Sequence, residues 1–260
     1  MYEQALSLGL HLVGFTEHSP RPEGFTYTHE YRESLTRNLP RYVQEVLALR
    51  DAPRRGSGGE LCRVAFGMEM DWLSGEEEFA KQAAHAYPFD YRIGSVHFID
   101  HWGFDDGIGP WKDASQEECE QWYTAYFTAW QAMLASGLYQ IAAHPDLIKI
   151  FSVDQFHIWL DSDSARTLLG RALDTLKAQG MVMEVSSAGL RKKCREIYPC
   201  PAIMHMARVR DIPISFASDA HERGDIAYAF DALAAYAATF GYTEHAFFSD
   251  GRMTSVPFAL

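Results

Sequence analysis

Short apolar segments alternate with amphipathic helical segments along the whole chain, and no other feature limits the fold as strongly. The expected strands are residues 10–16, 62–70, 91–96, 139–143, 181–185, 213–217 and 246–248. The expected helices are residues 2–8, 29–50, 76–86, 116–135, 164–179, 202–210 and 226–240. Pro40 is expected to interrupt or restart the second of these helices.

The alternation also predicts how the strands pair. Strands that alternate with helices pair in parallel through right-handed crossovers. These strands are apolar throughout, as is typical of strands with both faces buried. An α/β chain of 260 residues with this pattern is expected to form a closed or nearly closed β/α barrel, with a doubly wound open sheet as the alternative. No internal repeat or long linker divides the sequence, so we expect one domain over residues 1–260.

Composition and charge disfavour several classes of function. The chain has 35 acidic and 23 basic residues, and its net charge of −12 disfavours binding to nucleic acid or to anionic membranes. No apolar run reaches the roughly 18 residues that a membrane-spanning helix needs. No G-x-G-x-x-G or P-loop motif follows a strand, no signal peptide is visible, and the four cysteines show no C-x-x-C spacing. We therefore expect a cytoplasmic protein without a disulfide framework.

Six of the seven expected strands end in a histidine, an aspartate or a glutamate. These residues are Glu17 and His18, Glu69 and Asp71, His97, His144 and Asp146, Glu184, and Asp219 and His221. In a parallel barrel the carboxyl ends of all strands lie on one face, where the following loops form the active site. We therefore expect these side chains to converge there. The remaining histidines lie in expected helices or loops, or at the start of a strand, and are expected to be structural or exposed.

Five of these side chains form a candidate metal-binding set: Glu69, His97, His144, Asp219 and His221. Imidazole nitrogens and carboxylates without thiolates are suitable ligands for Zn²⁺, Mn²⁺ or Fe²⁺. The set has more ligands than one four-coordinate ion needs, so it favours two or more ions, with Glu69 able to bridge them. Paired ions hold a hydroxide and polarise a phosphoryl oxygen, so hydrolysis of a phosphate ester is the expected reaction class.

A basic cluster, Arg191-Lys192-Lys193, follows the strand that ends at Glu184 and therefore lies on the expected active face. Clusters of this kind are usually solvated surface. In a chain with a net charge of −12 it is also a candidate phosphate clamp, because arginine can bind phosphate through two parallel hydrogen bonds.

Five motifs occur in an order and at spacings that resemble the PHP (polymerase and histidinol phosphatase) superfamily. They are Thr16-Glu17-His18, Gly67-Met68-Glu69, Gly94-Ser95-Val96-His97, Ala143-His144-Pro145-Asp146 and Ser218-Asp219-Ala220-His221. The stretch from Glu184 to Lys192, with Tyr198-Pro199 after it, narrows the resemblance to PHP-type histidinol-phosphate phosphatases. The resemblance covers nearly the whole chain, and the motifs are specific together although each is weak alone.

The resemblance implies a distorted (β/α)7 barrel of the TIM type that holds two to three divalent ions, Zn²⁺, Mn²⁺ or Fe²⁺. It implies that Glu69 bridges the first and second ions, and that His97 and His144 complete the second. The implied ligands of the other ions are Asp219 for the first and His18 and His221 for the third.

The resemblance also implies the residues around the ions and the reaction. The implied substrate-binding residues are Arg191, Lys192 and Ser187, and the implied supports of the ligands are Glu17 and Glu184. A metal-bound hydroxide would attack the phosphorus of histidinol phosphate. The implied catalytic residues are Asp219 and His221, and Asp219 or a neighbouring histidine would protonate the leaving alkoxide.

The sequence departs from the family pattern at its start. That pattern begins with a strand that ends in His-x-His, followed by a further histidine, whereas Met1 already stands in the next helix. The first barrel strand and its three histidines are therefore expected to be absent, so that only the second ion keeps its full set of protein ligands. Our interpretation is a misplaced start, with a true loss of the strand as the alternative. The unpaired strand 10–16 would favour association with another chain.

Two other functions stay open at this point. The chain could be another PHP phosphoesterase, acting on a nucleotide or a different small phosphate, or a non-catalytic module that binds metal or phosphate. The expected partner is a small phosphorylated substrate and neither nucleic acid nor membrane. A homo-oligomer is compatible with the sequence.

Overall fold

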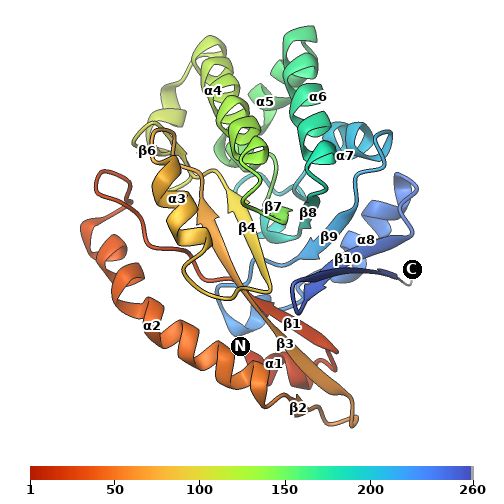
Figure 1. Ribbon diagram of the computed structural model, residues 1–260. Coiled ribbons are helices and arrows are strands. Elements are labelled where there is room, and N and C mark those ends of the chain that lie inside the picture. Colours follow the sequence, from red (N-terminus) through yellow and green to blue (C-terminus); the bar gives the residue numbers. More distant parts are fainter. Residues whose placement is uncertain (259–260) are drawn as a thin grey trace.

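A curled parallel sheet forms the centre of the computed structural model, which describes residues 1–258 (Figure 1). Its six strands, in their order across the sheet, are β1 (Leu12–Phe15), β3 (Leu61–Asp71), β4 (Tyr91–Ser95), β7 (Ile141–Ala142), β8 (Val182–Ser186) and β9 (Ile214–Ala217). Each strand is parallel to the next, which confirms the pairing expected from the alternation. Within the described residues β1 and β9 do not pair with each other. The sheet is therefore a curled half-barrel, which confirms the expected α/β fold: a distorted barrel of the PHP type that lacks its first strand.

The helices lie around the outer side of the curled sheet (Figure 1). They are α1 (Tyr2–Ser7), α2 (His29–Asp51), α3 (Glu77–Ala84), α4 (Gln116–Ala135), α5 (Val153–Leu160), α6 (Asp163–Ala178), α7 (Pro201–Arg208) and α8 (Phe230–Thr239). Short 3-10 turns cover Gly109–Asp113, Leu147–Phe151, Ala188–Arg191 and Arg223–Asp225. Three further short strands lie in the loops: β2 (Arg54–Arg55) pairs with the start of β3, and β5 (Phe98–Ile99) pairs with β6 (Trp102–Gly103).

Helix α4 has the bounds that the sequence predicts. It also links the hydrophobic core to the end of β7. Ser115 and Glu118 form a reciprocal capping box that fixes its first turn. Its inner face includes Tyr126 and Trp130, both fully buried, and burial of a large apolar side chain contributes about 2 kcal/mol. The Tyr126 hydroxyl donates to the carbonyl of His144 at 3.3 Å. The packing of α4 therefore helps to fix the backbone where β7 ends.

Helix α2 continues through Pro40 without a break, contrary to the expected interruption. Pro40 is exposed on the outer side of the helix. The hydroxyl of Tyr42, two residues further on, lies 2.9 Å from the carbonyl of Phe15 and 2.7 Å from that of Gly67. These contacts hold the second half of α2 on the sheet, although Pro40 cannot donate the usual backbone hydrogen bond within the helix.

Helix α8 begins at Phe230 and not at residue 226 as predicted. Ala227 and Ala229 have φ angles of 55° and 54°, which lie outside the right-handed helical region. The preceding turn, Arg223–Asp225, belongs to the loop that follows β9.

The last expected strand forms an antiparallel hairpin and does not join the parallel sheet. Strand β10 (Glu244–Ser249) pairs with β11 (Arg252–Pro257) across the two residues Asp250 and Gly251. Both of these have positive φ, 52° and 70°, which is the conformation of a tight hairpin turn and the reason that Asp-Gly favours one. The chain therefore reverses direction instead of adding a parallel strand.

The hairpin fills one end of the concave face of the half-barrel. Residues two apart on a strand point to the same face, so Ala65 shares its face with Glu69. Ala65 belongs to an apolar cluster with inner residues of the neighbouring strands and with Ala246 and Phe248 of β10. The rings of Tyr91 and Phe248 stack with their centroids 6.1 Å apart. The amino-terminal half of this face is thus apolar and packed, which leaves the carboxyl ends of the strands for polar groups.

Two further findings concern the described residues. Within residues 1–258, no helix combines the length and the apolar character that crossing a membrane requires. The cysteines Cys62, Cys119, Cys194 and Cys200 are buried free thiols.

Candidate metal centre

Strand β3 places two carboxylates side by side on the inner face of the sheet. Glu69 and Asp71 are two residues apart at the end of this strand, so they share a face, and their exposed fractions are 8% and 5%. Gly67 lies two residues before Glu69, on the same face of β3. A Cβ atom there would come within 2.7 Å of both Thr16 Cγ2 and Tyr91 Cζ, so glycine lets the neighbouring strands approach closely where the site begins.

Glu69, His97 and His144 form a compact buried group. His97 follows β4 and His144 follows β7. The Nε2 atom of His144 lies 3.2 Å from Glu69 Oε1, and Nε2 of His97 lies 3.6 Å from the same oxygen. One ligand atom from each residue lies within 4.8 Å of the others. The structure thus brings three of the expected metal-binding side chains onto one point.

The electrostatics of this group favour positive charge at its centre. Burial alone would raise the pKa of Glu69, but the charges of His18, His144 and His97 hold that pKa well below its usual range. Burial alone would lower the pKa of His144, but its hydrogen bond and charge interaction with Glu69 raise it to about 9. In the metal-free chain, protons on the histidines therefore balance the buried carboxylate.

These residues fit a divalent cation. The three donors are two imidazole nitrogens and a carboxylate oxygen, a set that suits Zn²⁺, Mn²⁺ or Fe²⁺. A cation would replace the protons that balance Glu69 in the metal-free chain. The Nδ1 atoms of His18 and His144 are buried and have no hydrogen-bond partner among the described residues.

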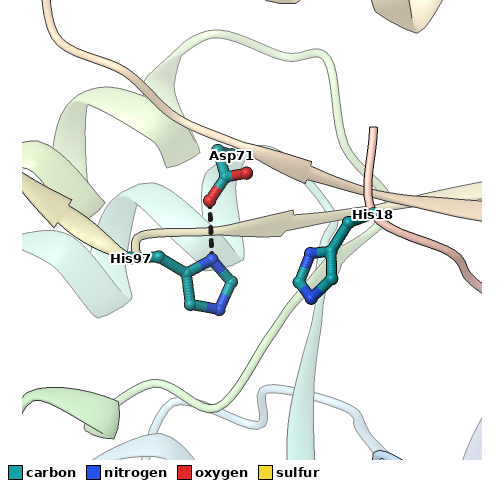
Figure 2. A group of neighbouring side chains, drawn as sticks. All are labelled: His18, Asp71 and His97. Atoms are coloured by element: carbon teal, nitrogen blue, oxygen red, sulfur yellow. Dashed lines mark hydrogen bonds and ion pairs between the residues drawn. The ribbon is translucent and has the colours of Figure 1, made fainter. Parts of the chain in front are cut away.

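His18 lies next to this group, after β1. Its backbone forms a parallel bridge with that of Glu69, and its ring centroid is 5.3 Å from that of His97. Figure 2 shows the rings of His18 and His97 beside one another, with Asp71 bonded to His97 only. The Nδ1 atom of His97 lies 2.6 Å from Asp71 Oδ1.

Asp219 and His221 lie in the loop after β9 and are more exposed than the central group. The exposed side-chain fractions are 25% for Asp219 and 63% for His221. Asp219 has a φ of 47°, in the left-handed region, and its carbonyl accepts the Nδ1 hydrogen bond of His221 at 3.0 Å. The ring of His221 is 6.5 Å from that of His18, so both candidates lie at the edge of the same site.

The two expected supporting carboxylates occupy different positions. Glu184, at 4% exposure, accepts a hydrogen bond from the backbone of His144 at 3.3 Å. Burial raises its pKa to about 7, with the negative charges of Asp219 and Glu69 adding to the effect. Glu17 is exposed, and its side chain accepts a hydrogen bond from the backbone of His18 at 3.1 Å.

Of the expected substrate-binding residues, Arg191 reaches the site most clearly. Its guanidinium donates to the carbonyls of Ser218 and Asp219 at 2.8 and 3.0 Å, and its Nε lies 3.2 Å from Asp225 Oδ1. The arginine thus braces the loop after β9. Lys192 is exposed, and its side chain makes no hydrogen bond or ion pair within residues 1–258.

Ser187, the third expected substrate-binding residue, follows β8 and is fully buried. Its hydroxyl has no hydrogen-bond partner in the part of the chain that the structure describes. The backbone of Ser187 donates to the carbonyl of Ala217, at the end of β9, at 3.1 Å. Ser187 is therefore placed between the two strand ends that lead to Arg191 and Asp219.

The ion pair of Arg21 and Asp71 is the part of the site that the sequence analysis missed. Asp71 was noted at the end of a strand but received no role, although its spacing of two from Glu69 places it on the same face. Arg21 lies in the loop before α2, 50 residues away from Asp71. No local pattern predicts such a contact.

A curled parallel sheet with histidines and carboxylates gathered at the carboxyl ends of its strands defines a metal-binding α/β protein. The chain belongs to the PHP domain family, whose profile matches residues 1–188. This confirms the resemblance that the motifs indicate.

Relatives within this family have names that refer to one activity. The "Probable histidinol-phosphatase" of Deinococcus radiodurans is 34% identical over 230 residues, which are 88% of this chain and 81% of that protein. The "Histidinol-phosphatase" of Bacillus subtilis is 28% identical over 247 residues, 89% of each chain. A crystal structure of histidinol phosphate phosphatase from Lactococcus lactis, in complex with zinc, L-histidinol and phosphate, has a TM-score of 0.69 at 20% identity. It covers 96% of this chain and 90% of that chain. At that identity the likeness concerns the fold.

Proposed function

We propose that this chain is a metal-dependent phosphomonoester hydrolase whose substrate is histidinol phosphate. The main support is the buried group Glu69, His97 and His144 in a PHP chain that is 34% identical to a protein named "Probable histidinol-phosphatase". Two further relatives have names of the same activity, and one was solved with zinc, L-histidinol and phosphate.

In this proposal Glu69, His97 and His144 hold one divalent ion, and His18, Asp219 and His221 contribute to one or two more. A bound ion of this kind supplies a nucleophile from water at neutral pH and stabilises charge on phosphoryl oxygens. The identity of the ions among Zn²⁺, Mn²⁺ and Fe²⁺, and their number, belong to the proposal.

The chain's own residues have three tasks. Arg191 binds the phosphate group, since a guanidinium matches its geometry and charge, while the exposed Lys192 contacts the substrate beside it. Ser187 is fully buried and supports substrate binding by joining the ends of β8 and β9 through its backbone. Whichever of Asp219 and His221 does not hold an ion protonates the leaving alkoxide. Both are partly exposed next to the buried group, so a substrate that enters from solvent reaches them.

Phosphate release tests this function directly. The chain, loaded with Mn²⁺ or Zn²⁺, is assayed on histidinol phosphate and on a panel that includes a nucleoside monophosphate. We expect the highest kcat/KM for histidinol phosphate, and a loss of more than about 100-fold in Glu69→Gln, since even residues behind the ligands affect activity by 10- to 100-fold.

The other two functions give different results in the same assay. A preference for the nucleotide would indicate another PHP phosphoesterase. A folded, metal-loaded chain that binds inorganic phosphate but hydrolyses no member of the panel would contradict the proposal and indicate a non-catalytic module. Circular dichroism of Glu69→Gln shows whether its loss reflects the site or the fold.

A further inference from the structure

We propose that Asp71 and Arg21 are positioning residues that hold the imidazole of His97 in the Nδ1–H tautomer, with Nε2 free to bind a cation beside Glu69. The inference rests on the proposed function, because it concerns a ligand of the proposed metal centre. None of the roles proposed so far involves the buried ion pair of Arg21 and Asp71.

The carboxylate of Asp71 has one hydrogen-bond partner on each oxygen. Oδ1 lies 2.6 Å from His97 Nδ1, and Oδ2 accepts from Arg21 Nε at 2.7 Å. Figure 2 shows the Nδ1 edge of the His97 ring directed at Asp71, with the second ring nitrogen on the far side. That second nitrogen, Nε2, is the one 3.6 Å from Glu69 Oε1. Because both oxygens are engaged, the carboxylate cannot rotate without losing a bond.

The side chain of Arg21 is held in place by aromatic rings and has one polar partner among the described residues. Its guanidinium lies 4.8, 5.5 and 5.0 Å from the ring centroids of Tyr27, Tyr31 and Phe98. The side chain is fully buried. Within residues 1–258, Nη1 and Nη2 have no hydrogen-bond partner and Asp71 provides the single ion pair. Burying a guanidinium in this way is unfavourable. Apolar replacements of buried ion pairs often leave proteins equally or more stable, so the pair points to a task beyond stability.

The chemistry of the two groups explains that task. A carboxylate only accepts hydrogen bonds, so it selects the tautomer in which His97 Nδ1 carries the proton. The lone pair is then on Nε2, the nitrogen that faces Glu69. Arg21 only donates, so it fixes the Asp71 oxygens as acceptors and sets their orientation.

A second interpretation would make Asp71 itself a metal ligand, because ligand atoms of His18, Asp71 and His97 also lie within 4.8 Å of one another. Two observations disfavour it. Each Asp71 oxygen already accepts a hydrogen bond. The guanidinium nitrogen 2.7 Å away adds a fixed positive charge that would repel a cation at this carboxylate.

The substitution Asp71→Asn separates the two interpretations because Arg21 dictates how the amide lies. Arg21 Nε donates, so the amide oxygen must face Arg21 and the amide NH₂ must face His97. His97 Nδ1 then has to accept, which moves its proton to Nε2 and blocks the nitrogen that would bind the cation. In the double variant Asp71→Asn, Arg21→Met the amide is free to turn its oxygen to His97. The double variant also carries no unpaired buried charge.

Two measurements on the 260-residue chain test these expected effects. The ¹⁵N NMR shifts of His97 in the metal-free protein, at a pH where the ring is neutral, report the tautomer. Competition with a chromophoric chelator gives the affinity for Zn²⁺. We expect Nδ1–H in the wild type and Nε2–H in Asp71→Asn with roughly 100-fold weaker zinc binding. We expect Nδ1–H again in the double variant, with zinc affinity within about 10-fold of the wild type.

Arg50→Met is the matched control, because Arg50 Nη1 lies 3.7 Å from Asp90 Oδ1, in an arginine–aspartate pair away from the site. It should change neither the tautomer nor the affinity. The inference is overturned if Asp71→Asn keeps Nδ1–H, or if the double variant binds zinc no better than Asp71→Asn. Wild-type protein that binds no zinc would refute the proposed function instead, and the tautomers would still decide the inference.

Discussion

The site residues on the central strands are held far more tightly than those in the loop after the outer strand β9. The exposed side-chain fractions are 10% for Glu69, 6% for His97 and 5% for His144. They are 25% for Asp219 and 63% for His221. The same kinds of side chain, at the same end of one sheet, therefore differ severalfold in their contact with solvent.

The topology of the sheet accounts for this difference. Strands β3, β4 and β7 each have a parallel neighbour on both sides, whereas β9 pairs with β8 alone within the described residues. Behind the central strands lies the core that α4 builds, which reaches His144 through Tyr126. The comparison teaches that burial pre-forms the proposed ion site of Glu69, His97 and His144, while Asp219 and His221 stay open to solvent.

The largest expected difference is between His144→Ala and His221→Ala. Removing His144 takes one of three donors from the buried group and leaves Glu69 short of a partner, so we expect zinc affinity at that group to fall by more than about 100-fold. His221→Ala should leave this affinity within about 10-fold and reduce turnover. Zinc titration with mass-spectrometric stoichiometry, together with phosphate release, checks both. Equal losses of zinc affinity in the two variants would contradict the distinction between the buried group and the exposed loop after β9.

The stability of the metal-free chain should fall as pH rises from 6.5 to 9. The pKa of His144 is raised from its ordinary 6.5 to about 9, so its contribution is complete below pH 6.5 and is lost as pH passes 9. The pKa of Glu184, raised from 4.5 to about 7, has the same sign, because its charged form is disfavoured in the fold. We expect a loss on the order of 2 kcal/mol in the free energy of unfolding.

Urea unfolding in chelator at the two pH values measures this effect. His144→Ala is the control and should show a flatter dependence. Excess Zn²⁺ should reverse the trend in the wild type, because metal binds deprotonated ligands and gains affinity as pH rises. Stability that stays constant across this range without metal would show that the central group is not balanced by protons.

A smaller effect is expected at the outer edge from Arg191→Ala. Loss of a charged hydrogen-bond donor to phosphate should raise KM for histidinol phosphate by about 10-fold. Because Arg191 also braces the carbonyls of Ser218 and Asp219, we expect a modest fall in kcat as well. Lys193→Ala, in the same basic cluster but exposed, is the control. Unchanged kinetics in Arg191→Ala would assign the cluster to solvated surface.

Much of the fold and of the site position follows from local sequence patterns. The alternation of strands and helices predicts that neighbouring strands pair in parallel. Because each strand then ends at the same edge of the sheet, the polar residues at the strand ends are predicted to lie together, as Glu69, His97 and His144 do. These features are readable because they depend on neighbours in the chain and on the period of two within a strand.

The features that could not be predicted depend on distant contacts or on weak local signals. The contact of Arg21 with Asp71 spans 50 residues, and neither side chain lies in a pattern that marks it as a partner. The hairpin after residue 243 had a local signal, Asp250-Gly251, but an apolar segment after a helix equally fits another parallel strand. Only the packing of Phe248 on Tyr91 decides between the two.

The position of the hairpin also has a consequence for biosynthesis. Ala246 and Phe248 cover inner residues of strands that leave the ribosome much earlier, among them Ala65 and Tyr91. Chains fold as they emerge, starting from the amino-terminal side. The concave face of the half-barrel therefore stays uncovered until β10 has been synthesised. Among the described residues, the apolar layer beneath the candidate metal centre is completed only by β10, so a nascent chain that stalls before residue 244 exposes an apolar surface to chaperones.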